Sequence, residues 1–287
     1  MSNLKDKSFL IVGLGLIGGS YAEGLKKAGY KVGAVTRSQS SIDYALEHGI
    51  IDAGTVSVTP EFVSEYDIVV FSLYPHVFIE WIEKYQEYIK PGALLTDVTG
   101  VKGAVVNRVQ SMLRPDLEFI GAHPMAGRET SGVQNATARV FEGANYIVTP
   151  TSKNTPEAIE TCEEIGRILG FKTISRLTTE QHDEMIGFLS QLTHCIAVSL
   201  MNCKDNSQEL ARFTGDSFRD LTRIARINEV MWTELFLLNR DELLRQMDLF
   251  SEQFNRLRNA IASGDEATMK KMMLTSTERR GYFDKKA

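Results

Sequence analysis

A glycine-rich turn close to the start of the chain constrains the fold more than any other feature. Three glycines in a G-x-G-x-x-G pattern follow an apolar run at residues 9–12 and open a predicted helix at residues 16–27. The first glycine permits a tight turn, the second lets phosphates approach the backbone, and the third lets helix and strand pack closely. The helix N-terminus adds free N–H donors and the positive end of a dipole. An ordinary βα turn is the alternative, but the order of strand, glycines and helix favours a site for a dinucleotide pyrophosphate. Its predicted contacts are Gly13, Gly15, Leu16, Ile17 and Gly18.

The end of the next predicted strand, residues 31–35, bears on which dinucleotide binds. A site selective for NAD carries Asp or Glu about 20 residues beyond the glycines, where the carboxylate binds the ribose 2′-hydroxyl. Thr36, Arg37 and Ser38 stand there in this chain. A carboxylate would repel the 2′-phosphate of NADP, whereas an arginine between two hydroxyls would pair with it through charge-assisted hydrogen bonds. Although a surface arginine is common at a strand end, we predict a preference for NADP, with NAD as the alternative cofactor.

The composition narrows the class of function. The 287 residues suffice for two domains, and the net charge of −5 provides no global field that would attract nucleic acid. Three cysteines without a C-x-x-C motif suit a reducing compartment, and the five histidines show no metal-ligand spacing. No segment has the pattern of a signal peptide or of a membrane-spanning helix. We therefore predict a soluble, cytoplasmic protein that acts on a small molecule and binds no metal, nucleic acid or membrane.

The chain divides into two halves of different pattern. Up to residue 176, short β-rich runs alternate with helical segments, which indicates an α/β protein with a Rossmann-like, doubly wound and mostly parallel sheet. After residue 178 the β pattern ends and apolar residues recur at helical spacing. We predict a dinucleotide-binding domain at residues 1–176 and an all-helical domain at residues 177–287. A nearly heptad stripe from Leu243 to Ile261 indicates a bundle core, and such a stripe often also forms a subunit interface.

The strand ends of the first half locate the candidate site, because ligands of such sheets bind beyond the carboxyl ends of the strands. Ser72 and Leu73 follow one predicted strand, Asp97 follows the next, and all three are expected to contact the cofactor. His123 follows a third strand, where a neighbouring proline and glycines restrain the backbone. A lone histidine is usually structural. At this edge, however, an imidazole that titrates near neutrality can accept a hydroxyl proton while hydride leaves the same carbon.

Two groups of polar residues lie in the predicted helical half. Gln191 and His194, three residues apart, share a polar stripe on an otherwise apolar helix predicted at residues 180–202. Arg219 and Arg223 are spaced to face one side of another helix. Arginine binds planar carboxylates with two hydrogen bonds, so this pair is a candidate carboxylate clamp. The alternatives are a water-bonded histidine at a bundle surface and a solvated basic face paired with nearby aspartates.

Six segments carry a resemblance to a known family: GLGLIGGS at 13–20, TDVTGVK at 96–102, GAHPMAGRETSG at 121–132, FEGANYIVTPT at 141–151, HDEMIGFLSQLTH at 182–194 and FRDLTRIARINEVMW at 218–232. They resemble the prephenate/arogenate dehydrogenase family of tyrosine biosynthesis, and the match extends over nearly the whole chain. The resemblance implies a Rossmann-like N-terminal domain, a helical C-terminal dimerisation domain and a homodimer. It also implies NAD(P)-dependent oxidative decarboxylation of prephenate to 4-hydroxyphenylpyruvate.

The resemblance further implies roles for individual residues. His123 is similar to the catalytic histidine that accepts a hydrogen bond from the ring 4-hydroxyl. His194 is similar to the second active-site histidine, and Arg223 to the arginine that binds a substrate carboxylate. The family commonly has a serine that orients the catalytic histidine where this chain has Gly100, and we take the adjacent Thr99 as the candidate hydroxyl. The remaining predicted substrate contacts are Arg219, Gln191 and Trp232.

Three alternatives to a prephenate dehydrogenase are compatible with these residues. The substrate could carry an amino group in place of the keto group, as arogenate does, and would then give tyrosine directly. A β-hydroxyacid dehydrogenase or an imine reductase shares the N-terminal half, but such enzymes typically use a lysine or an acid from the helical domain. A catalytically inactive NADP-binding regulator would have no need of both His123 and Arg223.

Overall fold

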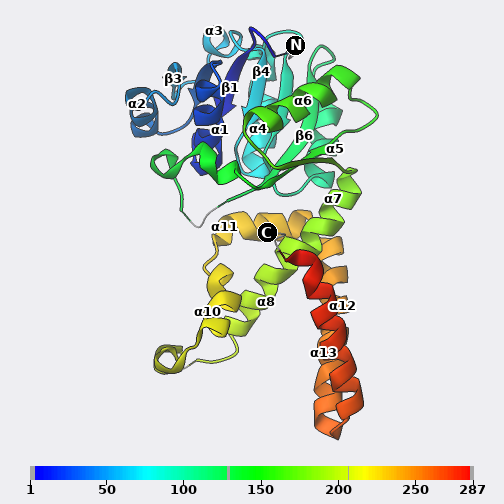
Figure 1. The fold of residues 1–287 in the computed structure, drawn as a ribbon. Helices are drawn as coiled ribbons and strands as arrows, with labels where there is room; N and C mark the ends of the chain where they lie inside the picture. Colours follow the sequence, from blue (N-terminus) through cyan, green and yellow to red (C-terminus); the bar gives the residue numbers. More distant parts are fainter. Residues whose placement is uncertain (1–3, 128–129, 206, 285–287) are drawn as a thin grey trace. The chain divides into compact units, whose positions relative to one another are not determined.

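A computed structural model describes residues 4–127, 130–205 and 207–284 of the chain. The chain divides into two compact units, residues 1–239 and 240–287. The sheet ends at Arg176, and the helices that follow it as far as residue 238 belong to the same compact unit as the sheet (Figure 1). The boundary that we predicted at residue 176 therefore separates sheet from helices, and the boundary between the compact units lies further along the chain.

Eight strands form one sheet in the order β3-β2-β1-β4-β5-β6-β7-β8 (Figure 1). Neighbouring strands are parallel except for β6 and β7, which run antiparallel. This confirms the predicted Rossmann-like, mostly parallel sheet. The strands are β1 Ser8–Val12, β2 Lys31–Val35, β3 Ala53–Thr55, β4 Ile68–Phe71, β5 Leu94–Asp97, β6 Glu118–Met125, β7 Asn145–Thr149 and β8 Thr173–Arg176.

Helices cover both faces of the sheet because its central strands are apolar on both sides. In β1, Phe9 and Ile11 belong to a core shared with α1, α2 and α6. Leu10 and Val12 point the other way and belong to a core shared with α3, α4 and α5. The helices are α1 Leu16–Lys27, α2 Gln39–Glu47, α3 Pro60–Val63, α4 Pro75–Tyr85, α5 Gly103–Met112 and α6 Pro156–Ile168.

Strand β6 changes its partner half-way along. Residues 118–120 pair in parallel with β5, and residues 121–125 pair antiparallel with β7. His123 was predicted to follow a strand, but it lies inside β6, opposite Ile147. The neighbouring proline and glycines suggested a loop, yet pairing with β7 accommodates them. Because β5 ends at Asp97 while β6 continues, this half of β6 extends beyond the carboxyl edge of β5.

The remainder of the first unit is helical. Its α-helices are α7 Thr179–Ile186, α8 Leu192–Met201, α9 Ser207–Leu210, α10 Asp216–Thr222 and α11 Glu229–Leu238, and the π-helical turn Gly187–Gln191 joins α7 to α8. Within the described residues, one stretch, Thr179–Met201, is long and apolar enough to cross a membrane by length and composition alone. Our expectation that no such stretch exists is corrected on that criterion. The side chains of His182 and Gln191 in this stretch are buried and form hydrogen bonds within this unit.

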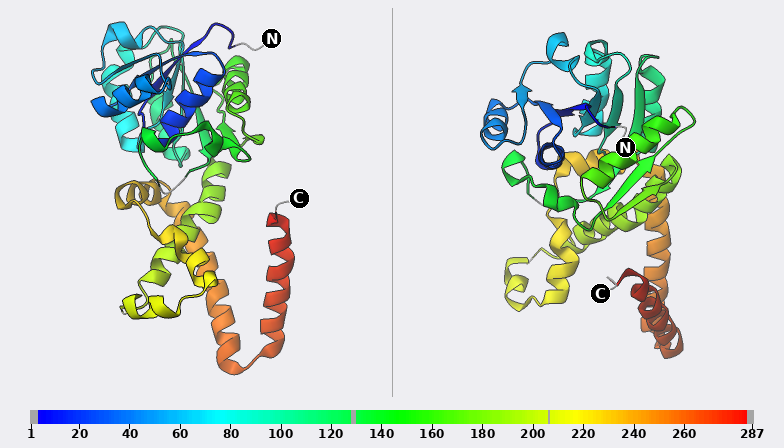
Figure 2. Two further views of the ribbon diagram at one scale, coloured as in Figure 1. Left: turned by 60° about the vertical axis from the view of Figure 1, so that its left-hand side comes forward. Right: turned by 45° about the horizontal axis from the view of Figure 1, so that its top comes forward.

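The second unit is a hairpin of two helices, α12 Arg240–Ser263 and α13 Glu266–Arg280 (Figure 2). The stripe predicted between Leu243 and Ile261 lies on α12. In that stripe Phe254 and Ile261 are each 61% exposed. The stripe therefore does not form a closed bundle core within one chain, and its exposed apolar side chains favour the alternative of a subunit interface.

Candidate active site

The glycine turn between β1 and α1 fits the pyrophosphate of a dinucleotide. Gly13 has a φ of +99°, and a Cβ atom there would lie 2.2 Å from the carbonyl oxygen of Ser72. A Cβ at Gly18 would lie 2.0 Å from the carbonyl oxygen of Gly13, whereas Gly15 faces open space. Gly15 is also the N-cap of α1, whose first residues are Leu16 and Ile17, and no side chain caps this helix. The N–H groups of its first turn are therefore available to a phosphate.

The ends of β2 and β4 lie beside the same turn. Gly13 N donates a hydrogen bond to the Val35 carbonyl at 2.8 Å, and Ser72 N donates one to the Val12 carbonyl at 2.8 Å. The Leu73 side chain lies 2.8 Å from the position that a Gly13 Cβ would occupy. The structure thus brings the predicted residues after β4 to the glycine turn.

Thr36, Arg37 and Ser38 follow β2 as predicted. The Ser38 hydroxyl caps α2 by accepting a hydrogen bond from Ser41 N at 3.2 Å. Arg37 is exposed and has no hydrogen bond or ion pair with another residue of the described chain. A guanidinium in this state can bind an anionic group of a ligand.

Strand β5 ends in a buried ion pair. The Asp97 carboxylate accepts a hydrogen bond from Lys102 Nζ at 2.7 Å, and both side chains are 0% exposed. It also accepts hydrogen bonds from the Thr99 hydroxyl and from the backbone N–H groups of Thr99 and Ala122, the last two at 3.0 and 3.1 Å. Three of these four donors meet Oδ2, the Ala122 N–H meets Oδ1, and the carboxylate is buried away from any ligand. The predicted contact between Asp97 and the cofactor is therefore corrected for its side chain.

The Thr99 hydroxyl is used inside the same loop. It donates to Asp97 and accepts a hydrogen bond from Lys102 Nζ at 3.2 Å. The prediction that Thr99 orients His123 is therefore corrected, because these bonds direct the hydroxyl to the ion pair. The next residue is Gly100, and a Cβ there would lie 3.9 Å from His123 Cε1.

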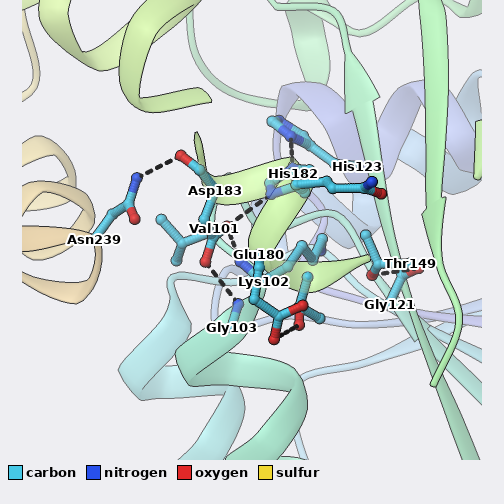
Figure 3. A network of polar contacts seen from close by, with 12 residues as sticks. Val101, Lys102, Gly103, Gly121, His123, Thr149, Glu180, His182, Asp183 and Asn239 are labelled. Carbon is cyan, nitrogen blue, oxygen red and sulfur yellow. Dashed lines mark hydrogen bonds and ion pairs between the residues drawn. The ribbon is translucent and has the colours of Figure 1, made fainter. Parts of the chain in front are cut away.

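His123 belongs to a chain of three side chains contributed by β6 and α7 (Figure 3). Its Nδ1 lies 2.9 Å from His182 Nε2, and His182 Nδ1 lies 2.7 Å from Asp183 Oδ1. His182 is 0% exposed, whereas His123 is partly exposed. The Asp183 carboxylate also accepts hydrogen bonds from Lys102 N and Gly103 N, both at 2.8 Å. Asp183 thereby joins α7 to the start of α5, where a negative charge is favourable.

Burial dominates the electrostatics of the two histidines. It lowers the pKa of His123 well below the ordinary histidine value, and His182 and Lys102 lower this pKa further. Burial also lowers the pKa of His182, with Asp183 acting in the opposite direction. Both imidazoles are therefore neutral near pH 7, and a neutral imidazole can accept a proton.

The second predicted histidine lies beside an aromatic ring. His194 on α8 packs against Trp232 on α11, with ring centroids 3.7 Å apart. His194 Nδ1 lies 2.9 Å from the carbonyl oxygen of Ser190. A carbonyl only accepts, so this contact places the proton on Nδ1 of His194.

Gln191 has a structural environment. Its side chain is buried, its amide donates to the Leu235 carbonyl at 3.0 Å, and its Oε1 accepts a hydrogen bond from Asn239 at 2.7 Å. Asn239 also donates to the carbonyl oxygen of Asp183 at 3.0 Å. The predicted contact of Gln191 with substrate is corrected, because both ends of its amide join the π-helical turn to α11.

Arg219 and Arg223 line a cavity of about 740 Å³ in the helical part of the first unit. Met201 from α8 and Phe218 from α10 contribute apolar surface to it. The exposed guanidinium of Arg219 pairs with Asp216 at 2.8 Å, which agrees with the solvated alternative for this residue. The predicted residues of the helical half therefore gather around α8, and those of the sheet gather at β6 and the glycine turn.

Three residues of the site were not predicted from the sequence: Lys102, His182 and Asp183. His182 and Asp183 are adjacent at the start of the segment at 182–194 that carries the family resemblance, and Lys102 ends the similar segment at 96–102. This adjacency was the available signal. Their significance comes from His123, which is 59 residues from His182 in the sequence and is joined to it only by the fold.

A dinucleotide-type sheet, a glycine turn and a neutral histidine at the carboxyl edge together define the class of nicotinamide-nucleotide-dependent dehydrogenases. Two family models match this chain consecutively: prephenate dehydrogenase, nucleotide-binding domain, over residues 21–174, and prephenate dehydrogenase, dimerization domain, over residues 178–275. The chain belongs to the prephenate dehydrogenase family.

Individual relatives agree with this assignment. The chain is 29% identical to a prephenate dehydrogenase of Bacillus subtilis, over 98% of this chain and 76% of the relative. The crystal structure of prephenate dehydrogenase from Aquifex aeolicus in complex with hydroxyphenyl propionate and NAD+ is similar with a TM-score of 0.89 and 29% identity, covering 99% and 100% of the two chains. The structure of Synechocystis arogenate dehydrogenase is similar with a TM-score of 0.83 and 25% identity, covering 96% and 100%.

Proposed function

We propose that this chain catalyses the oxidative decarboxylation of prephenate to 4-hydroxyphenylpyruvate, with hydride transfer to NADP, in tyrosine biosynthesis. The observation that carries the proposal is the neutral His123 at the carboxyl edge of the sheet that also bears the glycine turn. Family membership supports the reaction class, and the Aquifex relative binds NAD+ together with an aromatic acid that carries a phenolic ring.

The role of His123 follows from its protonation state. A bound nicotinamide dinucleotide supplies the acceptor for the hydride that leaves C4 of the substrate ring. His123 holds the proton of the 4-hydroxyl as C4 becomes carbonyl-like. The bond between C1 and its carboxylate then breaks, CO₂ leaves, and the electron pair enters the ring. The oxygen at C4 becomes a phenol as the proton returns from His123, so that the substrate has lost one hydride and one CO₂. Because aromatisation favours this step, the protein acts mainly by positioning.

The helical residues are proposed to hold the rest of the substrate. Arg223 is proposed to bind a carboxylate, since its cavity offers guanidinium groups beside apolar side chains. His194 and Trp232, which pack together, are proposed to contact the ring or its side chain. Arg219 lines the same cavity, pairs with Asp216 at 2.8 Å, and is proposed as a further contact of the substrate.

NADP rather than NAD is proposed as the cofactor. Arg37 is exposed beyond β2 with no partner in the described chain, and no carboxylate occupies residues 36–38 to repel a 2′-phosphate. Thr36 and Ser38 can add hydroxyl contacts to the same phosphate.

A cytoplasmic homodimer is proposed as the working form. The matched dimerization domain and the exposed apolar stripe on α12 support the dimer. All three cysteines are free, which supports a reducing compartment. Neither a metal nor nucleic acid nor a membrane is proposed as a partner.

The proposed function is tested by initial rates with prephenate and with arogenate, each against NAD and NADP. We expect the highest kcat/KM for prephenate with NADP. A higher kcat/KM for arogenate than for prephenate would instead identify the chain as an arogenate dehydrogenase, the activity named for the Synechocystis relative. Absence of turnover with both substrates, alongside tight NADP binding, would favour the inactive regulator.

A further inference from the structure

We propose that His182 and Asp183 are positioning residues which hold His123 in the tautomer that carries its proton on Nδ1 and leaves Nε2 free to accept the substrate proton. This inference deepens the proposed function and rests on it for the identity of the substrate. The assignment of the tautomer itself depends only on hydrogen bonds that the protein makes without a ligand.

The direction of the hydrogen bonds in this chain of side chains is set at Asp183, which acts as an acceptor. Its carboxylate accepts hydrogen bonds from two backbone N–H groups, Lys102 N and Gly103 N, at 2.8 Å each. Backbone N–H groups can only donate, so they hold the carboxylate in one orientation as an acceptor. His182 Nδ1, at 2.7 Å from the same carboxylate, must therefore carry a proton and donate it.

The protonation of His182 then determines which nitrogen of His123 carries its proton. His182 is 0% exposed, and its burial favours the neutral ring. A neutral imidazole with its proton on Nδ1 has a lone pair on Nε2. His123 Nδ1 lies 2.9 Å from that nitrogen, so His123 donates in this contact. The neutral His123 ring then presents an unprotonated Nε2, which the proposed proton transfer requires.

Among the described neighbours of His123, the contacts through His182 and Asp183 are the ones that orient its ring. Gly100 has no side chain to hold the ring, and a Cβ at Gly100 would meet the apolar side chain of Leu235 as well as His123 Cε1. The charged groups near the rings are Asp183 from α7 and the paired Asp97 and Lys102 from β5 and the loop after it. Because Asp97 and Lys102 bond to one another, Asp183 is the carboxylate that polarises the histidine chain.

The same contacts support the protonated intermediate. When His123 holds the hydroxyl proton it becomes an imidazolium ion, whose Nδ1–H still donates to His182. Hydrogen bonds with an ionised donor are stronger than neutral ones, so the contact stabilises His123 more in the transition state than in the ground state. A buried carboxylate that holds a catalytic imidazole acts by the same principle.

The tautomer is tested by ¹⁵N NMR of the histidine side chains in ligand-free protein. The variants are His182→Leu, which removes the acceptor at similar volume, His182→Gln, whose amide oxygen can accept from His123, and Asp183→Asn. His48→Gln changes an exposed histidine that directly follows α2 as its C-cap, and it serves as the matched control. We expect the Nδ1–H tautomer of His123 in wild type, His48→Gln and His182→Gln, and a mixture or the Nε2–H tautomer in His182→Leu and Asp183→Asn. A wild-type His123 protonated on Nε2 would overturn the inference.

Kinetics on the same variants tests the catalytic consequence. We expect His182→Leu to lower kcat roughly 10- to 100-fold, part of the contribution of a positioned acid–base group, with little change in substrate KM. His182→Gln should recover most of this loss. Equal kcat values for His182→Leu and wild type would contradict the positioning role. If wild type turns over neither prephenate nor arogenate, the proposed function fails, while the NMR result still decides the tautomer.

Discussion

At the scale of single residues, burial changes what His123 can do. The sequence places a histidine near the carboxyl edge of the sheet. In the structure, desolvation by the surrounding protein lowers the pKa of this partly exposed ring well below the ordinary value, and His182 and Lys102 lower this pKa further. A histidine with a lowered pKa stays neutral down to a lower pH, so its capacity to accept a proton is present above that pKa and is lost as the pH falls through it.

The acid limb of the pH profile should report this shift. We predict that kcat/KM for prephenate falls on the acid side at a pH below ~6.5, the ordinary histidine value. The measurement is a profile of kcat/KM over the acidic range in constant ionic strength. A limb centred above ~6.5 would mean that His123 is not the titrating group or is not desolvated.

Substitution of His123 separates chemistry from binding. His123→Asn keeps a hydrogen-bonding side chain but removes basicity, so we predict a fall in kcat of roughly 100-fold or more with NADP affinity nearly unchanged. Arg223→Ala should instead raise substrate KM, since a carboxylate clamp holds ground state and transition state alike until CO₂ leaves. Near-normal turnover of His123→Asn would move the role to another group, with His194 the next candidate.

Arg37 tests cofactor selectivity. Arg37→Ala removes one charged hydrogen-bonding partner from the 2′-phosphate, which is worth on the order of 1.5–3 kcal/mol, or roughly a 10- to 150-fold rise in KM for NADP. KM for NAD should change little. Arg108→Ala, which removes a surface arginine paired with Glu83, is the control. If wild type uses NAD better than NADP, our interpretation of residues 36–38 is wrong.

At the scale of elements, a few contacts between distant segments place the site. Asp183 on α7 caps the start of α5, and Asn239 after α11 holds both α7 and the π-helical turn. The buried ion pair between Asp97 and Lys102 holds the loop between β5 and α5 in place. Buried pairs of this kind are costly to break, because the remaining charge has no water around it.

We predict that Lys102→Met destabilises the protein by about 3–5 kcal/mol, since it leaves the Asp97 carboxylate buried without its partner. Combining it with Asp97→Asn should cost less than the sum of the two single changes. Lys90→Met removes the more exposed partner of Asp67 and should cost ~1 kcal/mol or less. Equilibrium unfolding in urea measures the free energy of unfolding of the two single variants at the buried pair, of their combination and of Lys90→Met. Equal losses for Lys102→Met and Lys90→Met would show that burial of the pair has no consequence for stability.

At the scale of the whole molecule, exposed apolar side chains point to a second copy of the chain. The stripe on α12 includes Phe254 and Ile261, each 61% exposed, within the region matched by the family's dimerization domain. A single soluble chain rarely leaves such a stripe uncovered.

We predict that wild type sediments as a dimer of the 32.1 kDa chain, and that Phe254→Glu with Ile261→Glu shifts it toward monomer by placing charges in an apolar contact. Glu252→Gln on the same helix is the control. A wild-type monomer at micromolar concentration, or a double variant that stays fully dimeric, would contradict the proposed interface.

The sequence by itself determined the features that depend on local pattern. The glycine turn, the bounds of α1 at residues 16–27 and the alternation that makes a doubly wound sheet are all encoded within short segments, through steric limits at glycine and through apolar periodicity. The position of His123 near the carboxyl edge was predictable for the same reason.

Only the tertiary structure decided which polar groups meet. It placed His123 inside β6 because that strand changes partner, and it joined His123 to His182 across 59 residues. It directed Asp97 and Thr99 into a buried ion pair with Lys102, and it buried the amide of Gln191. Hydrogen-bond partners and desolvation depend on how distant segments pack, and no local pattern in the chain contains that information.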